Sequence, residues 1–166
     1  MPIRNLTLLV FICFSSIFYA QESISELLKK YNNETIPYIS VQELALPDEE
    51  VIILDAREIK EYNTSHLENA LHVGYDFFDM ASILENIKDK SSKIVVYCSV
   101  GIRSEDIAEK LKKEGYTNIY NLFGGIFEWK NNDFIVYDEH NQPTENVHTF
   151  SKKWSSWLIK GNKIYA

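Results

Sequence analysis

Residues 93–114 read KIVVYCSVGIRSEDIAEKLKKE, and this stretch decides the fold. The β-branched and aromatic run Ile94–Tyr97 predicts a buried strand that ends at Cys98. A short glycine-containing loop leads from there to Arg103. A helix is expected to begin near Ser104, whose hydroxyl can cap it, because acidic residues follow in the first turn and lysines crowd the last.

Cys98 therefore stands at the carboxyl end of a predicted strand and before the amino end of a helix. Backbone amides and the helix dipole in such a place lower a thiol pKa from about 8.5 toward ~3.5–7.5. Converging loop amides would also hold an anion above the sulfur. The alternative is an inert, buried structural thiol. We predict Cys98 as a nucleophile, followed by an anion-binding loop of Ser99, Val100, Gly101, Ile102, Arg103 and Ser104.

Other apolar runs alternate with helical patterns along the chain. This alternation predicts an α/β fold with a central parallel sheet flanked by helices, in which sites form at the carboxyl ends of strands. Strands are expected at Tyr38–Ile39, Val51–Leu54, Ala70–Val73 and Ile119–Leu122. Helices are expected from Glu22, after a capping Ser40, at Arg57–Tyr62, at Phe77–Ile87 with Phe77 on the apolar face, and from Gly124-Gly125.

The last part of the chain is expected to form a short extension. Phe134–Tyr137 predicts an extended piece at the rim of the sheet. Apolar residues then recur at helical spacing and predict a helical segment within 138–166 that docks on the domain. A second interpretation is that this tail lines the mouth of the Cys98 pocket, with His148 nearby, and selects the donor or acceptor. The residues of the helical pattern are Val147, Phe150, Trp154, Trp157 and Leu158.

Composition limits the classes of protein to consider. A chain of 166 residues with 45% apolar residues can build one domain, which we place at 22–137. The net charge of −7 argues against a nucleic-acid surface. Residues 1–20 carry Arg4 before an apolar run, as in a secretory signal peptide, so we expect a periplasmic or secreted protein. An uncleaved membrane anchor is the alternative, and only then would the membrane be a partner.

The loop from Cys98 to Arg103 has a C-x4-R spacing, and with it the sequence resembles the rhodanese (sulfurtransferase) family. The likeness covers about residues 38–136. Ser65 and Asn69 depart from the family pattern, in which Gly is usual at both positions, and they put the geometry of an early turn in question. The further matching segments are Asp55-Ala56-Arg57, Glu61-Tyr62, His66-Leu67, Ala70, Asn121-Leu122, Gly124-Gly125 and Trp129.

The resemblance implies a sulfurtransferase that moves a sulfane sulfur from thiosulfate or a persulfide donor to a thiol or protein acceptor. Cys98 would carry the sulfur as a persulfide, with no cofactor and no metal. Arg103 has two possible roles, which are pairing with an anionic donor or bracing the loop through a nearby carboxylate. Asp55 and Arg57 are interpreted as a structural ion pair, and His66 as a hydrogen-bonded structural residue.

Two other functions stay open at this point. The first is a non-enzymatic sulfur carrier or binding module of the same fold, which passes its persulfide to one protein partner. The second is a phosphatase or arsenate reductase. Phosphatases of this fold have a loop one residue longer, C-x5-R, so the six-residue ring beginning at Cys98 favours sulfur over phosphate.

Overall fold

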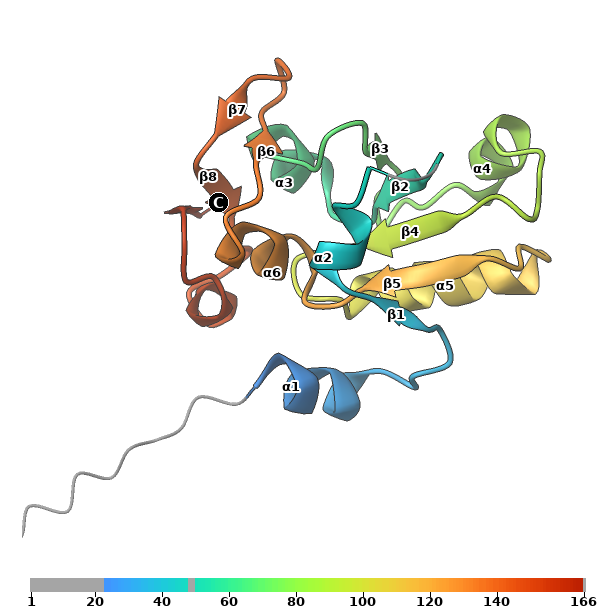
Figure 1. Ribbon diagram of the computed structural model, residues 1–166, viewed down its shortest axis with the longest axis horizontal. Coiled ribbons are helices and arrows are strands. Elements are labelled where there is room, and N and C mark those ends of the chain that lie inside the picture. The colour runs from blue at the N-terminus through green and yellow to red at the C-terminus, as the bar shows by residue number, and fades with distance from the viewer. Residues whose placement is uncertain (1–22, 48–49, 166) are drawn as a thin grey trace, which may run out of the picture.

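The computed structural model describes residues 23–47 and 50–165, so the predicted leader over residues 1–20 lies outside the described residues. Its centre is a five-stranded sheet in which every pair of neighbours is parallel (Figure 1). This is the α/β architecture that the sequence predicts. In spatial order the strands are β1 (Tyr38–Ile39), β5 (Ile119–Leu122), β4 (Ile94–Tyr97), β2 (Ile52–Asp55) and β3 (Leu71–His72).

Strand β4 is the middle of the sheet, and all four of its residues are buried. Successive side chains of a strand point to opposite faces. Accordingly, Val95 and Tyr97 belong to one apolar cluster, and Ile94 and Val96 belong to the other. Because both faces of β4 are covered, the strand reads as one continuous apolar run, and it delivers Cys98 to the carboxyl edge of the sheet.

The helices cover both faces of the sheet, with α5 behind β4 and β5 and α2 in front of the sheet in Figure 1. Ser23 and Ser40 each begin a helix with a capping box, as predicted for Ser40. Helix α4 begins only after Asp79, which caps it, so the prediction that Phe77 lies on its apolar face is wrong and Phe77 is 92% exposed. The helices are α1 (Ile24–Tyr31), α2 (Val41–Leu44), α3 (Ile59–Thr64), α4 (Met80–Asn86), α5 (Arg103–Lys113) and α6 (Gly125–Asn131).

The C-terminal segment folds differently from its prediction. The extended piece after α6 pairs with β7 in a separate two-stranded sheet and does not extend the rim of the main sheet. The apolar positions predicted as one helix do not share an element: Val147 lies in a strand, Trp154 and Trp157 lie in a single 3-10 turn, η1, and Phe150 and Leu158 lie outside both. Both Val147 and Leu158 are nevertheless buried in the main core. The elements are β6 (Val136–Tyr137), β7 (Pro143–Thr144), β8 (Asn146–His148), η1 (Trp154–Trp157) and β9 (Asn162–Ile164), with β8 parallel to β9.

The C-terminal segment lies at the end of the sheet toward which β4 and β5 point (Figure 1). The Lys130 ammonium anchors it through an ion pair with Glu145, 2.8 Å from the carboxylate. The Asn131 side chain also donates to the carbonyl of Trp157 and accepts from the amide of Ile159. These contacts fix the segment over the edge of the sheet where Cys98 emerges.

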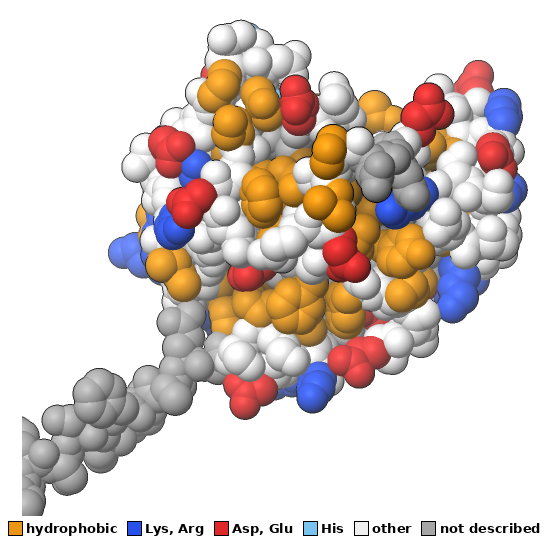
Figure 2. Space-filling model, viewed as in Figure 1, with side chains coloured by type: hydrophobic (Ala, Val, Ile, Leu, Met, Phe, Trp, Pro, Cys, Tyr) orange, Lys and Arg blue, Asp and Glu red, His pale blue; other side chains and the backbone are white. Residues whose placement is uncertain are grey.

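Apolar side chains also reach the surface on the face shown in Figure 2. Leu46 and Ile135 are 62% and 54% exposed and border a shallow hollow next to Trp129 and Phe134. None of the residues that line this hollow lines the pocket at Cys98. Within residues 23–47 and 50–165, no helix has the length and hydropathy that crossing a bilayer requires.

Candidate active site

The Cys98 sulfur lies inside the loop that joins β4 to α5. Its Sγ atom accepts a hydrogen bond from the Gly101 amide at 3.1 Å, and the Ser104 hydroxyl lies 3.5 Å away. Gly101 has a φ of +108°, which a residue with a side chain rarely adopts. The loop can therefore curl back over the sulfur only because this position is glycine.

Two asparagine side chains fix the loop from outside. The Nδ2 groups of Asn121, on β5, and Asn32, at the end of α1, each donate to the Gly101 carbonyl at 2.8 Å. The Ser104 hydroxyl lies 2.7 Å from Oδ1 of Asn121. The predicted capping role of Ser104 is wrong, because α5 begins one residue earlier, at Arg103, and the hydroxyl is directed toward Asn121 and Cys98.

These surroundings favour the thiolate. Burial raises the pKa of the Cys98 thiol, but the Arg103 charge and the hydrogen bonds from Ser104 and Gly101 outweigh burial. The net result is a pKa below the ordinary value of a cysteine. A thiol with this pKa has a larger thiolate fraction at neutral pH than a free cysteine, as a nucleophile requires.

Arg103 is held by a carboxylate from another element. Its Nη1 and Nη2 atoms donate to the two oxygens of Glu61, on α3, each at 2.8 Å. The Ser99 hydroxyl donates to Glu61 at 3.1 Å and accepts from Arg103 at 3.1 Å. Of the two roles predicted for Arg103, the structure therefore shows the bracing role, because its guanidinium already donates hydrogen bonds to both carboxylate oxygens of Glu61.

The Glu61 side chain is 2% exposed, so this ion pair lies almost wholly out of water. Burial raises the pKa of Glu61, and the hydrogen bonds and charge of Arg103 outweigh it, which brings the pKa to about 2. Burial lowers the pKa of Arg103, but Glu61 and Cys98 raise it by more than burial lowers it. The net pKa is raised, so the guanidinium stays charged. The loop is thus locked to α3 by a charged pair that stays ionised at neutral pH.

The Gly124-Gly125 pair brings α6 against the beginning of the loop. The amides of Ile126 and Phe127 donate to the carbonyls of Cys98 and Ser99 at 2.9 and 3.2 Å. A Cβ atom on Gly125 would lie 2.2 Å from the Cys98 carbonyl oxygen. Close packing of helix on strand, and not phosphate binding, therefore explains this glycine pair, as the sequence indicates.

Asp55 and Arg57 form a fully buried pair next to the loop but away from the sulfur. Nη2 of Arg57 lies 2.6 Å from Oδ2 of Asp55 and also donates to the Ser65 carbonyl at 2.6 Å. The Tyr97 hydroxyl donates to Asp55 at 2.6 Å. These contacts tie the ends of β2 and β4 to the turn after α3, which is a structural role.

His66 lies in that turn. Its Nδ1 atom is 3.1 Å from the Tyr62 carbonyl, and its ring stacks on the Tyr62 ring with centroids 4.1 Å apart. Its backbone pairs with that of Tyr137. Across residues 23–47 and 50–165, no three His, Cys, Asp or Glu side chains come close enough together to hold a metal ion.

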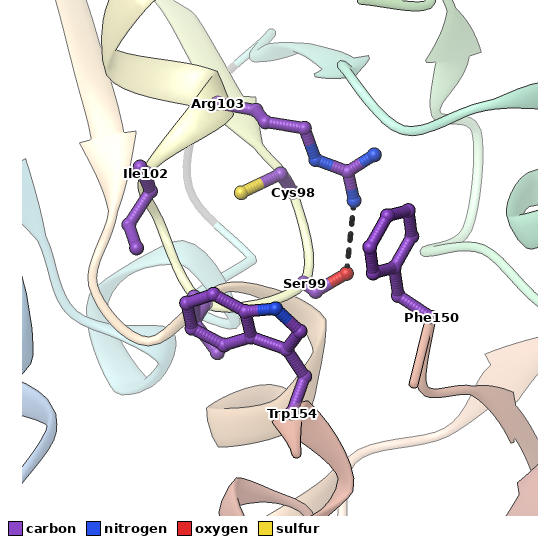
Figure 3. A pocket seen from close by; sticks show the side chains of 7 residues that line it. Cys98, Ser99, Ile102, Arg103, Phe150 and Trp154 are labelled. Carbon is purple, nitrogen blue, oxygen red and sulfur yellow. Dashed lines mark hydrogen bonds between the residues drawn. The ribbon is translucent and has the colours of Figure 1, made fainter. Parts of the chain in front are cut away.

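A pocket of about 180 Å³ opens over the loop and gives access to the otherwise buried Cys98. Figure 3 shows the sulfur at the centre of this pocket, with Arg103 on one side and the rings of Phe150 and Trp154 on others. Both rings come from the C-terminal segment, so this segment docks on the domain and lines the mouth of the pocket. The lining residues are Cys98, Ser99, Val100, Ile102, Arg103, Phe150 and Trp154.

Comparison with known proteins agrees with the α/β fold of the domain and identifies its family. The family model described as a rhodanese-like domain matches residues 40–132, which is more than half of the chain. The chain belongs to the rhodanese-like family. The thiosulfate sulfurtransferase GlpE of Coxiella burnetii is 35% identical over 83 residues, which cover 49% of this chain and 73% of that protein.

Other relatives of this rhodanese-like chain carry a different name. The tRNA uridine(34) hydroxylase of Erwinia tasmaniensis is 42% identical over 89 residues, or 51% of this chain. The chain spans only 25% of that protein's length, so the likeness concerns one part of the hydroxylase. Among solved structures, protein hp1203 of Helicobacter pylori has a TM-score of 0.52 at 28% identity, over 69% of this chain and 96% of that one.

Three contributors to this rhodanese-like site were not predicted in their roles. From the sequence, Glu61 and Asn121 are expected only as parts of segments that match the family pattern, and no role is expected for Asn32. All three bind the loop from positions at least 17 residues away in sequence, as the Ser104–Asn121 contact illustrates. The signal in the sequence is that Glu61 and Asn121 lie within segments that match the family pattern. Only the structure shows that both are buried, and buried polar side chains need partners.

Proposed function

We propose that this protein is a sulfurtransferase that takes a sulfane sulfur from a thiosulfate or persulfide donor onto Cys98 and passes it to a thiophilic acceptor. The environment of one atom, the Cys98 sulfur, carries the proposal. The Cys98 sulfur has a lowered pKa, accepts the Gly101 amide, and faces a pocket that a small reagent can enter. A thiolate in this position can act as a nucleophile toward a soft electrophile, and sulfane sulfur is a soft electrophile.

The reaction has two steps. The Cys98 thiolate forms a bond to the outer sulfur of the donor, whose own sulfur–sulfur bond breaks and leaves its electron pair on the departing group. An acceptor thiolate then attacks the outer sulfur of the Cys98 persulfide and releases the Cys98 thiolate. Among the described residues, none accepts a hydrogen bond from the amides of Val100, Ile102 or Arg103. These amides are therefore available to stabilise the anionic persulfide.

The names of the relatives support this proposal to different degrees. The Coxiella burnetii relative named a thiosulfate sulfurtransferase is matched over 73% of its length, so most of that protein is compared. The tRNA uridine(34) hydroxylases are matched over a third or less of theirs. The relative named a sulfurtransferase therefore supports the proposed function better than the hydroxylases support theirs, and hydroxylation of tRNA is not proposed for this chain.

A phosphatase or arsenate reductase is less well supported. An enzyme of that kind needs a free guanidinium over the loop to hold a tetrahedral oxyanion. The Arg103 guanidinium is bonded to Glu61 and to Ser99, and Glu61 would repel an incoming phosphate. Together with the six-residue ring, this arrangement disfavours a phosphate or arsenate substrate.

The decisive experiment measures sulfur loading and turnover separately. Purified protein is incubated with thiosulfate, and then with a persulfide donor, and the intact mass is measured. A gain of one sulfur atom that Cys98→Ser abolishes supports the proposal, and release of thiocyanate in the presence of cyanide shows turnover. Loading without turnover would favour the non-enzymatic carrier, and no loading with any donor would contradict both.

We further propose that the protein acts outside the cytoplasm, as a periplasmic or secreted protein. This proposal is supported only by the leader pattern of residues 1–20. Fractionation of cells that express the full chain, together with the mass of the mature N-terminus, tests it. A full-length protein in the soluble cytoplasmic fraction would contradict it, and a full-length protein in the membrane fraction would favour the uncleaved anchor.

A further inference from the structure

The pocket over Cys98 offers no unpaired positive charge. Arg103 is the one charged side chain among the described residues that line it, and its guanidinium is already bonded by both oxygens of Glu61. A doubly charged donor such as thiosulfate would lose its hydration there without meeting a free cation. Only the loop amides remain for the transferred sulfur itself.

Apart from Arg103, Cys98 and Ser99, the side chains that line the pocket are apolar. Val100 and Ile102 belong to the loop, and Phe150 and Trp154 belong to the C-terminal segment. In Figure 3 the two aromatic rings and Ile102 stand around the sulfur on the sides that Arg103 leaves open. A group that is attached to the outer sulfur of a donor must therefore lie against apolar side chains.

The backbone at Phe150 is strained in a way that presents its ring to the pocket. Phe150 has a φ of +60°, and the Ser151 amide donates across it to the Thr149 carbonyl, so it is the centre of a three-residue turn. A bulky residue is seldom found in this conformation. Its amide is also held by Nδ1 of His148 at 3.1 Å.

The ring gains little burial in return for this conformation. Phe150 remains 57% exposed, and its ring lies 5.7 Å from the Arg103 guanidinium. Core packing therefore does not account for a phenylalanine at this position. Strained residues of this kind gather at functional sites, where the surrounding structure holds them.

We propose that the site takes its sulfane sulfur from a donor that carries it on an apolar organic group, and that Phe150 and Trp154 select this group. This inference rests on the proposed sulfurtransferase function and narrows its substrate class. The two rings act as specificity-determining residues, because they touch the part of the donor that is not transferred.

Two thiosulfonates that differ only in this group provide the probe. The Cys98 thiolate attacks the outer sulfur of R–SO2–S⁻, a bond forms between the two sulfurs, and the S–SO2R bond breaks. The electron pair leaves on the sulfinate R–SO2⁻, and no proton or oxidant is needed. Methanethiosulfonate and benzenethiosulfonate carry the same charge, so their comparison reports on the apolar group, and thiosulfate adds the effect of the second charge.

The experiment measures kcat/KM for both donors on the full chain and on the Phe150→Asn and Trp154→Ala variants, with cyanide as the acceptor. We expect the wild type to prefer benzenethiosulfonate by about tenfold, which is about 1.4 kcal/mol. Each variant is expected to reduce the ratio at least threefold. The intrinsic reactivity of the two donors is common to all proteins, so a change in the ratio isolates the pocket.

Phe77→Ala is the matched control, since Phe77 is 92% exposed and does not line the pocket. Phe150→Asn should unfold at an equal or higher urea concentration than the wild type, because Asn adopts the left-handed conformation more readily. A large loss of stability in that variant would show a packing role for Phe150 and would overturn the proposal. Quenching of tryptophan fluorescence by benzenesulfinate, absent in Trp154→Ala, gives a binding readout that does not depend on turnover.

The outcomes separate this inference from the function on which it rests. If no donor loads Cys98, the proposed function fails. If Cys98 is loaded but the ratio of the two thiosulfonates is the same in the wild type and both variants, only the selection by Phe150 and Trp154 fails. If thiosulfate is used as well as benzenethiosulfonate, the argument from the paired Arg103 is wrong.

Discussion

Replacing either partner of the Arg103–Glu61 pair should destabilise the protein while moving the Cys98 thiol in opposite directions. In Glu61→Gln the side chain keeps its shape and loses its charge, which leaves Arg103 buried without a counter-charge. The pKa of Glu61 is about 2 against an ordinary value of 4.5. At 1.36 kcal/mol per pKa unit, this difference corresponds to about 3 kcal/mol of stability at neutral pH.

The effect on the thiol follows from the charge of Arg103, which lowers the pKa of Cys98 against the effect of burial. In Glu61→Gln that charge is no longer balanced, so the pKa of Cys98 should fall further. In Arg103→Gln the charge is gone, and the pKa of Cys98 should rise. Both variants are thus expected to lower the free energy of unfolding, while they shift the pKa of the Cys98 thiol in opposite directions.

Two assays check this prediction on protein that carries Cys13→Ser, so that Cys98 is the one thiol in the sequence. Urea unfolding followed by tryptophan fluorescence gives the free energy of unfolding. The rate of alkylation by iodoacetamide between pH 5 and pH 10 gives the pKa of the thiol. If both variants shift the thiol pKa in the same direction, the electrostatic account of the loop is refuted.

The same pair predicts a pH dependence of stability. The folded pKa of Glu61 lies below its unfolded value, so its contribution is fully present above about pH 4.5 and is lost as the pH falls toward 2. Glu61→Gln should therefore lose less stability than the wild type between pH 5 and pH 3. An equal loss in both proteins would mean that other groups govern the acid sensitivity.

Three other substitutions test the surroundings of the loop. Gly125→Ala places a Cβ atom 2.2 Å from a carbonyl oxygen. Gly115→Ala is its control, because Gly115 also has a positive φ but a Cβ there would meet nothing within 4 Å. In urea unfolding, Gly125→Ala should cost about 3 kcal/mol more than Gly115→Ala. An equal cost would show that strain alone matters. Asn121→Leu removes the bond to the Gly101 carbonyl and should cost about 1–3 kcal/mol and slow alkylation of the thiol; unchanged alkylation would mean that the loop holds itself. Tyr97→Phe should cost about 1–3 kcal/mol in unfolding and leave the thiol pKa unchanged, because the pKa of Cys98 is governed by Arg103, Ser104 and Gly101; a shifted thiol pKa would show that the Tyr97–Asp55 contact also acts on the thiol.

The sheet and the position of Cys98 at its carboxyl edge could be predicted because they depend on local pattern. A strand that is covered on both faces needs an unbroken apolar run, and Ile94–Tyr97 supplies it. The helix that follows needs a break after Cys98 and acidic residues in its first turn, and both are present. These signals lie within a few residues of each other, so a single sequence is sufficient to read them.

The partners of the loop could not be predicted from local pattern, because they come from elements distant in sequence. Glu61 and Arg103 are separated by 42 residues, and nothing near Glu61 indicates which of several cations it would meet. The two early departures from the family pattern, Ser65 and Asn69, differ in how the structure receives them: the Ser65 hydroxyl is buried without a hydrogen-bond partner among the described residues. Ser65 supplies a carbonyl to Arg57, and Asn69 takes a φ of +58°, which asparagine tolerates better than most residues.

The C-terminal segment shows why a correct pattern led to a wrong element. Val147 and Leu158 are buried as their apolar character requires, but the first lies in a strand and the second directly follows a 3-10 turn, with no α-helix between them. A continuous helix through residues 147–158 would hold Phe150 in right-handed geometry, whereas its observed φ is +60°. The break in the helix is therefore tied to the presentation of the Phe150 ring at the Cys98 pocket. The segment thus forgoes helical hydrogen bonds and places Phe150 and Trp154 at the pocket over Cys98, as the proposed selection of the donor requires.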